Sequence, residues 1–386
     1  MRNKSRDAYL IITTVFFTLM ITVVLYNMFL NTGEIKKFNE VREILKNEYY
    51  VALDQNKLVD DALNGMVDAI GDKYTDYLTK AEWDERKKDF AGEYTGIGVS
   101  FDTNAKGDVF IAEIYEASPA QKAGLKVGDI LKVFEGIKLT KESDVEQMFA
   151  DFTGDSITMK LYRPSTKALF VKTVQKETIV EINATSKVID NEIGYIKLES
   201  FDDDIAKDFK ALYSKLAAKE IKGLIIDVRD NFGGSLNQVV EICDFLLPKC
   251  TIVSVQGQRT EKEYYYSDET GISIPITVLV NKNSASASEV LAGALKDNKR
   301  ATLVGNKTFG KGLVQNSTEF DDGSAIYYTE ARYFTPSGIC IHGIGIEPDI
   351  KVSLAKKYDK YYVSSIPTAD DLQLKAAIKD VKGKIK

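Results

Sequence analysis

The chain has 386 residues, enough for two or three domains, and its hydrophobic and charged fractions of 44% and 28% are those of a globular protein. A net charge of −6 without a basic stripe argues against a nucleic-acid partner. One histidine and three cysteines in no metal-binding spacing give no reason to expect a metal or a disulfide scaffold. Cys243 and Cys250 flank an apolar run and are interpreted as core residues, and a disulfide between them is left open.

Residues 8–30 form an apolar run that three basic residues precede. About 20 apolar residues cross a bilayer, and a basic flank keeps the N-terminus in the cytoplasm. A cleavable signal peptide is the alternative, but no Ala-x-Ala-like site follows the run, which favours an uncleaved signal anchor. We therefore expect residues 1–33 to be a cytoplasmic tail and a single-pass transmembrane helix in the cell membrane, with the rest of the chain outside the cytoplasm.

Residues 34–92 form a helical N-terminal region. Apolar residues at helical spacing predict one helix over residues 35–50 and another over residues 58–70, and Gly71 suits the C-cap of the second. Their apolar faces are interpreted as core packing.

Residues 93–172 read as short strands around two short helices, with glycines in the first loop. The first loop is Gly96-Ile97-Gly98-Val99, and Ser-Pro-Ala, Ala-Gly-Leu and Gly-Asp-Ile-Leu motifs follow between residues 118 and 131. With these motifs the segment resembles a PDZ domain. The resemblance implies that the amides of Gly96, Ile97, Gly98 and Val99 bind the terminal carboxylate of a peptide, and glycines allow consecutive amides to converge on an anion.

The pattern changes again after residue 173. Strands are expected at residues 193–198 and 223–228, with an amphipathic helix at 205–219 between them, which predicts an α/β core with parallel strands. A Gly233-Gly234 turn follows the second strand. A turn of this kind either presents backbone amides to a ligand or is an ordinary glycine turn.

The stretch from residue 274 to 315 carries the candidate chemistry. An apolar strand at residues 276–280 leads into a serine-rich segment and an alanine-rich helix, so a serine stands where helix N–H groups can stabilise an oxyanion. A Ser-His-Asp triad would have to use His342, the only histidine. Lys311, between two glycines, is the alternative base, because a neutral lysine amine can accept the serine proton.

Ser284-Ala285-Ser286-Ala287-Ser288-Glu289, followed by Thr308-Phe309-Gly310-Lys311-Gly312 and Gln315, resembles the motif of the carboxyl-terminal processing (tail-specific) proteases. The resemblance implies that Ser286 is the nucleophile, that Lys311 is the general base and that Gln315 orients Lys311. It also implies an oxyanion hole made by Gly233 and Ala287, although Phe232 stands where the family usually has proline. Finally, it implies that residues 34–92 form a homodimer contact.

Two local alternatives stay open. Ser286 and Glu289 also fit a capping box, in which the serine hydroxyl serves the helix N-terminus. Asn283 or Ser284 can instead cap the helix and leave Ser286 free. In a regular strand Lys311 and Gln315 would lie roughly 13 Å apart, so a contact between them requires a turn or a bulge near Gly312.

We therefore predict an α/β multidomain protein: anchor, helical region, PDZ domain, α/β serine protease core at residues 173–354 and C-terminal helical region at 355–386. It would cleave protein or peptide substrates near their free C-termini without a cofactor. A catalytically silent PDZ-type peptide-binding scaffold is the alternative, and a hydrolase using His342 is another. Asp227 and Arg229 are interpreted as a buried structural ion pair.

Overall fold

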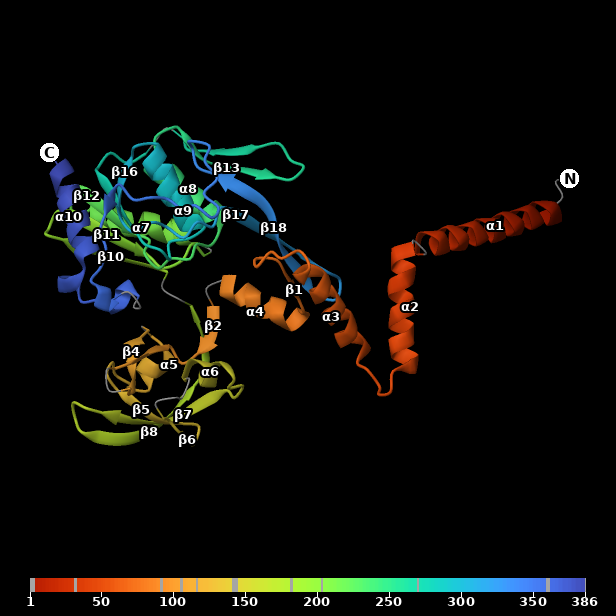
Figure 1. Cartoon of the computed structure of the whole chain (residues 1–386), viewed down its shortest axis with the longest axis horizontal. Coiled ribbons are helices and arrows are strands. Elements are labelled where there is room, and N and C mark those ends of the chain that lie inside the picture. The colour runs from red at the N-terminus through yellow and green to blue at the C-terminus, as the bar shows by residue number, and fades with distance from the viewer. Residues whose placement is uncertain are drawn as a thin grey trace. The chain divides into compact units, whose positions relative to one another are not determined.

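The computed structural model describes residues 4–30, 33–90, 93–104, 107–115, 117–140, 145–180, 183–202, 204–268, 271–358 and 362–385. The chain divides into two compact units, residues 1–77 and 78–386, whose elements are labelled in Figure 1.

The first unit is helical. Its helices are α1 (Lys4–Leu30), α2 (Gly33–Glu48) and α3 (Gln55–Asp68). Asp54 caps α3, because its carboxylate accepts the backbone N–H groups of Asn56 and Lys57. The two helices predicted within residues 34–92 are thereby confirmed.

A membrane-spanning helix is not found. Within the ranges given above, none of the helices combines the length and the apolar character that crossing a bilayer requires. The structure includes the apolar run at residues 8–30 in α1, and it does not support the transmembrane anchor predicted there.

The second unit starts with α4 (Lys80–Phe90), a helix that the sequence patterns did not predict, and continues into a domain of short strands. The elements of this domain are β2 (Glu93–Gly96), β3 (Val99–Thr103), β4 (Val109–Ile114), α5 (Pro119–Lys122), β5 (Ile130–Phe134), β6 (Ile137–Lys138), α6 (Val145–Ala150), β7 (Ser156–Arg163), β8 (Ala168–Gln175) and β9 (Glu177–Val180). The main sheet has the order β3-β4-β5-β7-β8, and β2 pairs with β9 where the chain enters and leaves the domain. The predicted arrangement of short strands around two short helices is confirmed.

An α/β core follows. Its elements are β10 (Ala184–Ile189), β11 (Ile193–Leu198), α7 (Ile205–Ala217), β12 (Gly223–Asp227), α8 (Leu236–Leu246), β15 (Ile276–Val280), α9 (Ala287–Asp297), β16 (Ala301–Gly305), β19 (Ile350–Lys351) and α10 (Leu372–Lys384). The sheet order is β10-β11-β12-β15-β16-β19. Every pair from β11 to β19 is parallel, as predicted, and only β10 at the edge is antiparallel.

Side chains of β12 alternate between two apolar layers, because successive residues of a strand point to opposite faces. Leu224 and Ile226 join the core formed with α7, α8 and α9, whereas Ile225 joins a smaller core under α10. With both faces covered, β12 and β15 are buried throughout and β11 is buried at all but one residue, which explains the largely apolar sequences of β12 and β15. The C-terminal helix therefore packs on the core of its own chain (Figure 1).

The chain also forms a second sheet, which is antiparallel. Its strands include β13 (Thr251–Gly257), β14 (Glu263–Tyr266), β17 (Leu313–Glu319) and β18 (Ala325–Phe334), and β18 pairs with both β13 and β17. Strands β13 and β14 pair with each other as an antiparallel hairpin. The remaining short elements are β1 (Asp76–Leu78), η1 (Lys356–Tyr358), η2 (Val363–Ser365) and η3 (Thr368–Asp370).

Two neighbouring strands end at the same edge of the parallel sheet. Because β12 and β15 run side by side in the same direction, the turn at residues 228–235 and the loop at residues 281–286 emerge next to each other. Asp230 and Asn281 join them: the Asp230 N–H donates to Asn281 Oδ1 at 3.0 Å, and Asn281 Nδ2 donates to Asp230 Oδ1 at 2.7 Å. The glycine turn and the serine loop are therefore brought together by the fold.

Candidate active site

Ser286 differs from the two serines beside it. The hydroxyl of Ser284 donates to the carbonyl oxygen of Val228 at 2.7 Å, and the hydroxyl of Ser288 donates to that of Asn231 at 2.9 Å, so both serve the fold. Ser286 is half-buried and lines a cavity of about 530 Å³. Of these three serines, Ser286 is the one that lines this cavity.

The backbone of Ser286 is strained. Its φ of 56° and ψ of −116° lie in a region that residues with a side chain rarely adopt, and such strain is typical of functional turns. Helix α9 begins immediately afterwards at Ala287, with Ser286 itself at the N-cap. The alternative in which Asn283 or Ser284 caps the helix is therefore wrong, because the chain does not turn into the helix until Ser286.

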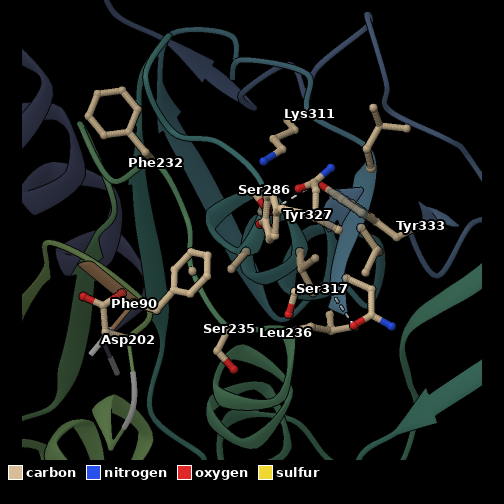
Figure 2. A pocket seen from close by; sticks show the side chains of 17 residues that line it. Phe90, Asp202, Phe232, Ser235, Leu236, Ser286, Lys311, Ser317, Tyr327 and Tyr333 are labelled. Carbon is tan, nitrogen blue, oxygen red and sulfur yellow. Dashed lines mark hydrogen bonds between the residues drawn. The ribbon is translucent and has the colours of Figure 1, made fainter. Parts of the chain in front are cut away.

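Lys311 lines the same cavity from the loop that precedes β17. Figure 2 shows its amine end directed toward Ser286. Gln315 and Ala287 line the cavity as well. The structure thus brings together four of the residues singled out from the sequence, although they are up to 29 positions apart in the chain.

Glu289 ties the serine and lysine segments together. This carboxylate is buried, its Oε2 accepts the N–H of Ser286 at 3.0 Å and that of Lys311 at 2.8 Å, and its Oε1 accepts the N–H of Gly310 at 2.7 Å and the hydroxyl of Thr308 at 2.6 Å. Burial raises the pKa of Glu289, and these four donors oppose that rise. The capping-box interpretation identified the bond to Ser286, but the bonds to the lysine loop had no signal in the sequence.

Two further contacts fix this corner. Tyr333, almost fully buried, donates its hydroxyl to the carbonyl oxygen of Ser286 at 3.1 Å. Burial raises the pKa of Tyr333 well above its ordinary value, so the hydroxyl stays protonated and can donate. Gly310 adopts a φ of 90°, and a Cβ there would lie 2.9 Å from the backbone nitrogen of Gly345. The loop that carries Lys311 is thus held by backbone packing and by hydrogen bonds.

Ala287 and Gly233, the predicted oxyanion-hole residues, lie beside Ser286, but their backbone N–H groups differ in their surroundings. Ala287 is the first residue of α9, where a helix leaves N–H groups without an intrahelical acceptor. Gly233 packs against Ser286 so closely that a Cβ would lie 2.7 Å from the serine Cβ. Its N–H, however, donates to Asn231 Oδ1 at 2.8 Å. Asn231 is fully buried and was not singled out from the sequence.

Gln315 stands just after an irregularity in β17. The pairing of β17 with β18 shifts between Val314 and Gln315, which is the kind of irregularity that the sequence predicted near Gly312. The Gln315 side-chain nitrogen donates to the hydroxyl of Thr329 at 3.4 Å. Gln315 lines the same cavity as Lys311.

The other charged candidates are accounted for by structure. Arg229 forms ion pairs with Asp227 at 2.6 Å and with Asp371 at 2.8 Å, and all three are buried, so the predicted structural ion pair is confirmed and extended. His342 lies exposed in a turn. In the part of the chain that the structure covers, no cluster of three or more His, Cys, Asp or Glu side chains could hold a metal ion, and the three cysteines are free thiols.

The predicted peptide-binding loop of the first sheet domain lies between β2 and β3. Gly96 ends β2, Val99 begins β3, and Gly98 has a φ of 75° with a Cβ position only 2.3 Å from Ser118 Cβ, so only glycine fits. Strand β3 is at the edge of its sheet. A free strand edge next to a glycine loop can accept a peptide as an additional strand.

The fold and the cavity together define a class: an α/β core with a serine and a lysine in one pocket, joined to a PDZ-like domain. Comparison with known protein families identifies the same domains. Peptidase family S41 matches residues 192–352, the PDZ domain matches residues 95–174, and the N-terminal domain of the activating protease CtpB matches residues 26–82.

Individual relatives are similar over most of their length. The carboxy-terminal-processing protease of Bartonella bacilliformis is 33% identical over 344 residues, which is 86% of this chain and 78% of the relative. A probable CtpA-like serine protease of Staphylococcus aureus strain COL is 32% identical over 366 residues, covering 90% and 72%. Among solved structures, the photosystem II D1 C-terminal processing protease is 27% identical with a TM-score of 0.52, covering 82% and 86%. The chain belongs to peptidase family S41, among the PDZ-containing carboxy-terminal-processing serine proteases.

Proposed function

We propose that the protein is a serine endopeptidase that cuts protein substrates near their C-termini, with Ser286 as nucleophile and Lys311 as general base. The observation that carries the proposal is that one cavity is lined by Ser286 at the start of α9 and by Lys311, whose amine end is directed toward it (Figure 2). The shared carboxylate of Glu289 supports it further, because it holds both backbones in one arrangement.

The chemistry would proceed as two acyl transfers. Neutral Lys311 accepts the hydroxyl proton while the Ser286 oxygen attacks the peptide carbonyl, and the resulting ammonium donates that proton to the leaving amine. Water then attacks the acyl-enzyme with Lys311 again as base, and Gln315 orients the amine throughout. No cofactor takes part in these steps.

The oxyanion would be held by the N–H groups of Ala287 and Gly233. Ala287 is ready for this role at the first turn of α9. The Gly233 N–H first has to leave Asn231 Oδ1, so we propose that substrate binding changes the conformation of this turn. In the PDZ domain, the amides of Gly96 to Val99 would bind the substrate's terminal carboxylate.

The place of action and the assembly are proposed from the sequence. We infer that residues 8–30 attach the protein to the cell membrane with the catalytic part outside the cytoplasm, because three basic residues precede this apolar run. We also infer a homodimer formed through residues 34–92. Digestion of intact cells with an added protease tests the location, and a protein that stays protected in the cytoplasm would contradict it. Sedimentation of a fragment that begins at residue 35 tests the homodimer, and a monomeric fragment would contradict it.

The catalytic proposal is tested with the same fragment and an unfolded protein that ends in an apolar tail. Ser286→Ala and Lys311→Ala should each abolish cleavage. Ser317→Ala, on the same cavity, and Lys307→Ala, on the same loop but exposed, are matched controls that should cut normally. His342→Ala should also retain activity. Cleavage by both of the first two variants would show that Ser286 and Lys311 are wrongly assigned.

A further inference from the structure

One wall of the Ser286 cavity comes from outside the α/β core. Phe90, the last residue of α4, lines the cavity together with Tyr327 of β18, and their ring centroids are 5.7 Å apart. Figure 2 shows Phe90 among the side chains that surround Ser286. Residue 90 lies between two of the segments that match known families: the first ends at residue 82 and the next begins at residue 95. The matched segments therefore include Tyr327 but not Phe90.

Helix α4 is fixed to the β17–β18 hairpin by a tryptophan. Trp83 is only 5% exposed and packs against Leu78 and Ala325. Its indole N–H donates to Glu319 Oε2 at 2.8 Å. The Trp83 and Phe90 ring centroids are 6.3 Å apart with the rings nearly perpendicular, an arrangement that aromatic pairs favour. The buried tryptophan thus holds Phe90 at the cavity.

Charged side chains add to this attachment. Lys87 lies 3.4 Å from Glu319 and 2.9 Å from Asp84, and the Arg86 guanidinium lies over the Tyr327 ring at 5.5 Å from its centroid. The same helix face therefore supports both aromatic rings of the wall.

The Phe90 ring still has apolar surface to bury. It is 42% exposed, and the cavity it lines also has the apolar lining residues Leu236 and Val290. An apolar substrate side chain placed against the ring would remove this surface from water, which is favourable. A charged side chain would lose its hydration there without a partner, which is costly.

We infer that Phe90 is a specificity-determining residue: with Tyr327 it forms the subsite that receives an apolar side chain of the substrate next to the bond cut at Ser286. The inference rests on the proposed peptidase function. It adds that the choice of substrate side chain is made by α4, a helix outside the catalytic core.

The first test compares two peptides that differ at one residue beside the cut, leucine against aspartate. In the wild type, kcat/KM should favour leucine, and in Phe90→Ala this preference should fall about tenfold, since burial against the ring is lost. Phe90→Leu should retain most of the preference. Phe320→Ala is the matched control, because Phe320 is similarly exposed, at 46%, at the end of the β17–β18 hairpin. An unchanged preference in Phe90→Ala overturns the inference while the peptidase function stands.

The second test does not depend on catalysis. Trp83 is the only tryptophan in the chain, so its fluorescence reports directly on the neighbourhood of Phe90. In the Ser286→Ala variant, binding of a leucine peptide that contains no tryptophan should change the Trp83 emission. Adding Phe90→Ala to this variant should raise the Kd of the leucine peptide about tenfold. The aspartate peptide should bind weakly to both variants. The inference is contradicted if the leucine and aspartate peptides bind Ser286→Ala equally well. It is also contradicted if the leucine peptide has the same Kd with and without Phe90→Ala, and both results hold even if the wild type cleaves no peptide.

Discussion

The two sides of the cavity are held by different kinds of contact. On the Ser286 side, the glycine turn, the serine loop and the lysine loop are joined by buried hydrogen bonds to Glu289 and Asn231. On the α4 side, Phe90 is held by aromatic contacts and by hydrogen bonds and ion pairs of the partly exposed Glu319. The first arrangement is costly to disturb, because a buried polar group that loses its partner is not compensated by water.

This difference separates chemistry from recognition. Buried hydrogen bonds allow one geometry for the reacting groups, as proton transfer requires. Aromatic packing at a partly exposed wall tolerates substitution and can be changed without unfolding the core. We therefore expect changes on the Ser286 side to reduce kcat and stability together, and changes on the α4 side to act mainly on KM.

The largest effect is expected for Glu289→Gln. The new amide group would replace an oxygen that accepts two hydrogen bonds, so donors would face donors in a buried site. We expect unfolding free energy to fall by about 3 kcal/mol or more and kcat/KM to fall at least about a hundredfold. Urea unfolding and peptide kinetics measure both, with the exposed Glu347→Gln as control. Wild-type kcat in Glu289→Gln would refute the role of this carboxylate.

Asn231→Ala should have the next largest effect. It removes the acceptor of the Gly233 N–H and the donor to the carbonyl oxygen of Leu198, both inside the core. We expect the unfolding free energy to fall by about 2 kcal/mol. Release of the Gly233 N–H alone would not slow the reaction, because this N–H has to leave Asn231 during the proposed mechanism, but we expect a roughly tenfold lower kcat since the turn also loses its contact with Leu198. Asn316→Ala, on the cavity surface but exposed, should change neither value by a comparable amount. Equal effects of the two substitutions would mean that the buried hydrogen bonds of Asn231 do not hold the turn.

Trp83→Phe tests the α4 side. The substitution keeps an aromatic ring and loses the indole hydrogen bond to Glu319. We expect a cost of about 1 kcal/mol in unfolding free energy and a several-fold higher KM for apolar peptides, with kcat unchanged. Steady-state kinetics separate the two constants. A lower kcat with an unchanged KM would contradict the division between chemistry and recognition.

The smallest effect concerns pH. The hydrogen bond from Trp83 holds the pKa of Glu319 below its ordinary value of 4.5, and Lys87 adds to this. Since the pKa is lowered in the folded state, the stabilisation is present above pH 4.5 and is lost as the pH falls through the lowered value. Trp83 emission should therefore change below pH 4.5 under native conditions. Glu319→Gln should lack this transition, and an identical acid titration in both proteins would rule out Glu319 as its source.

The sequence was most informative where a pattern is local. The strands at residues 193–198 and 276–280 were predicted with the bounds that the structure gives, because each is a short, mainly apolar segment of the kind that forms a buried parallel strand. The cavity around Ser286, Lys311 and Gln315 follows from motifs whose segments meet at one edge of that sheet. The roles assigned to these residues and the domain boundaries remain predictions.

The features that the sequence did not reveal depend on contacts between distant segments. Helix α4 has many charged residues and little apolar periodicity, and it is stabilised by burial of Trp83 against the β17–β18 hairpin some 240 residues later. The buried position of Asn231 likewise depends on a distant contact, the hydrogen bond from its side chain to the carbonyl oxygen of Leu198. The sequence left the start of the helix near Ser286 open, because Asn283 and Ser284 are also good capping residues, but the structure uses their side chains for loop contacts.

The central claim is that a neutral lysine amine activates Ser286, and the pH dependence of kcat/KM tests it most directly. A substrate peptide without titrating groups near the cut should be used, from pH 6 to pH 10. The rate should rise about tenfold per pH unit until Lys311 has lost its proton and then reach a plateau. A profile that is flat over this range would contradict a lysine base.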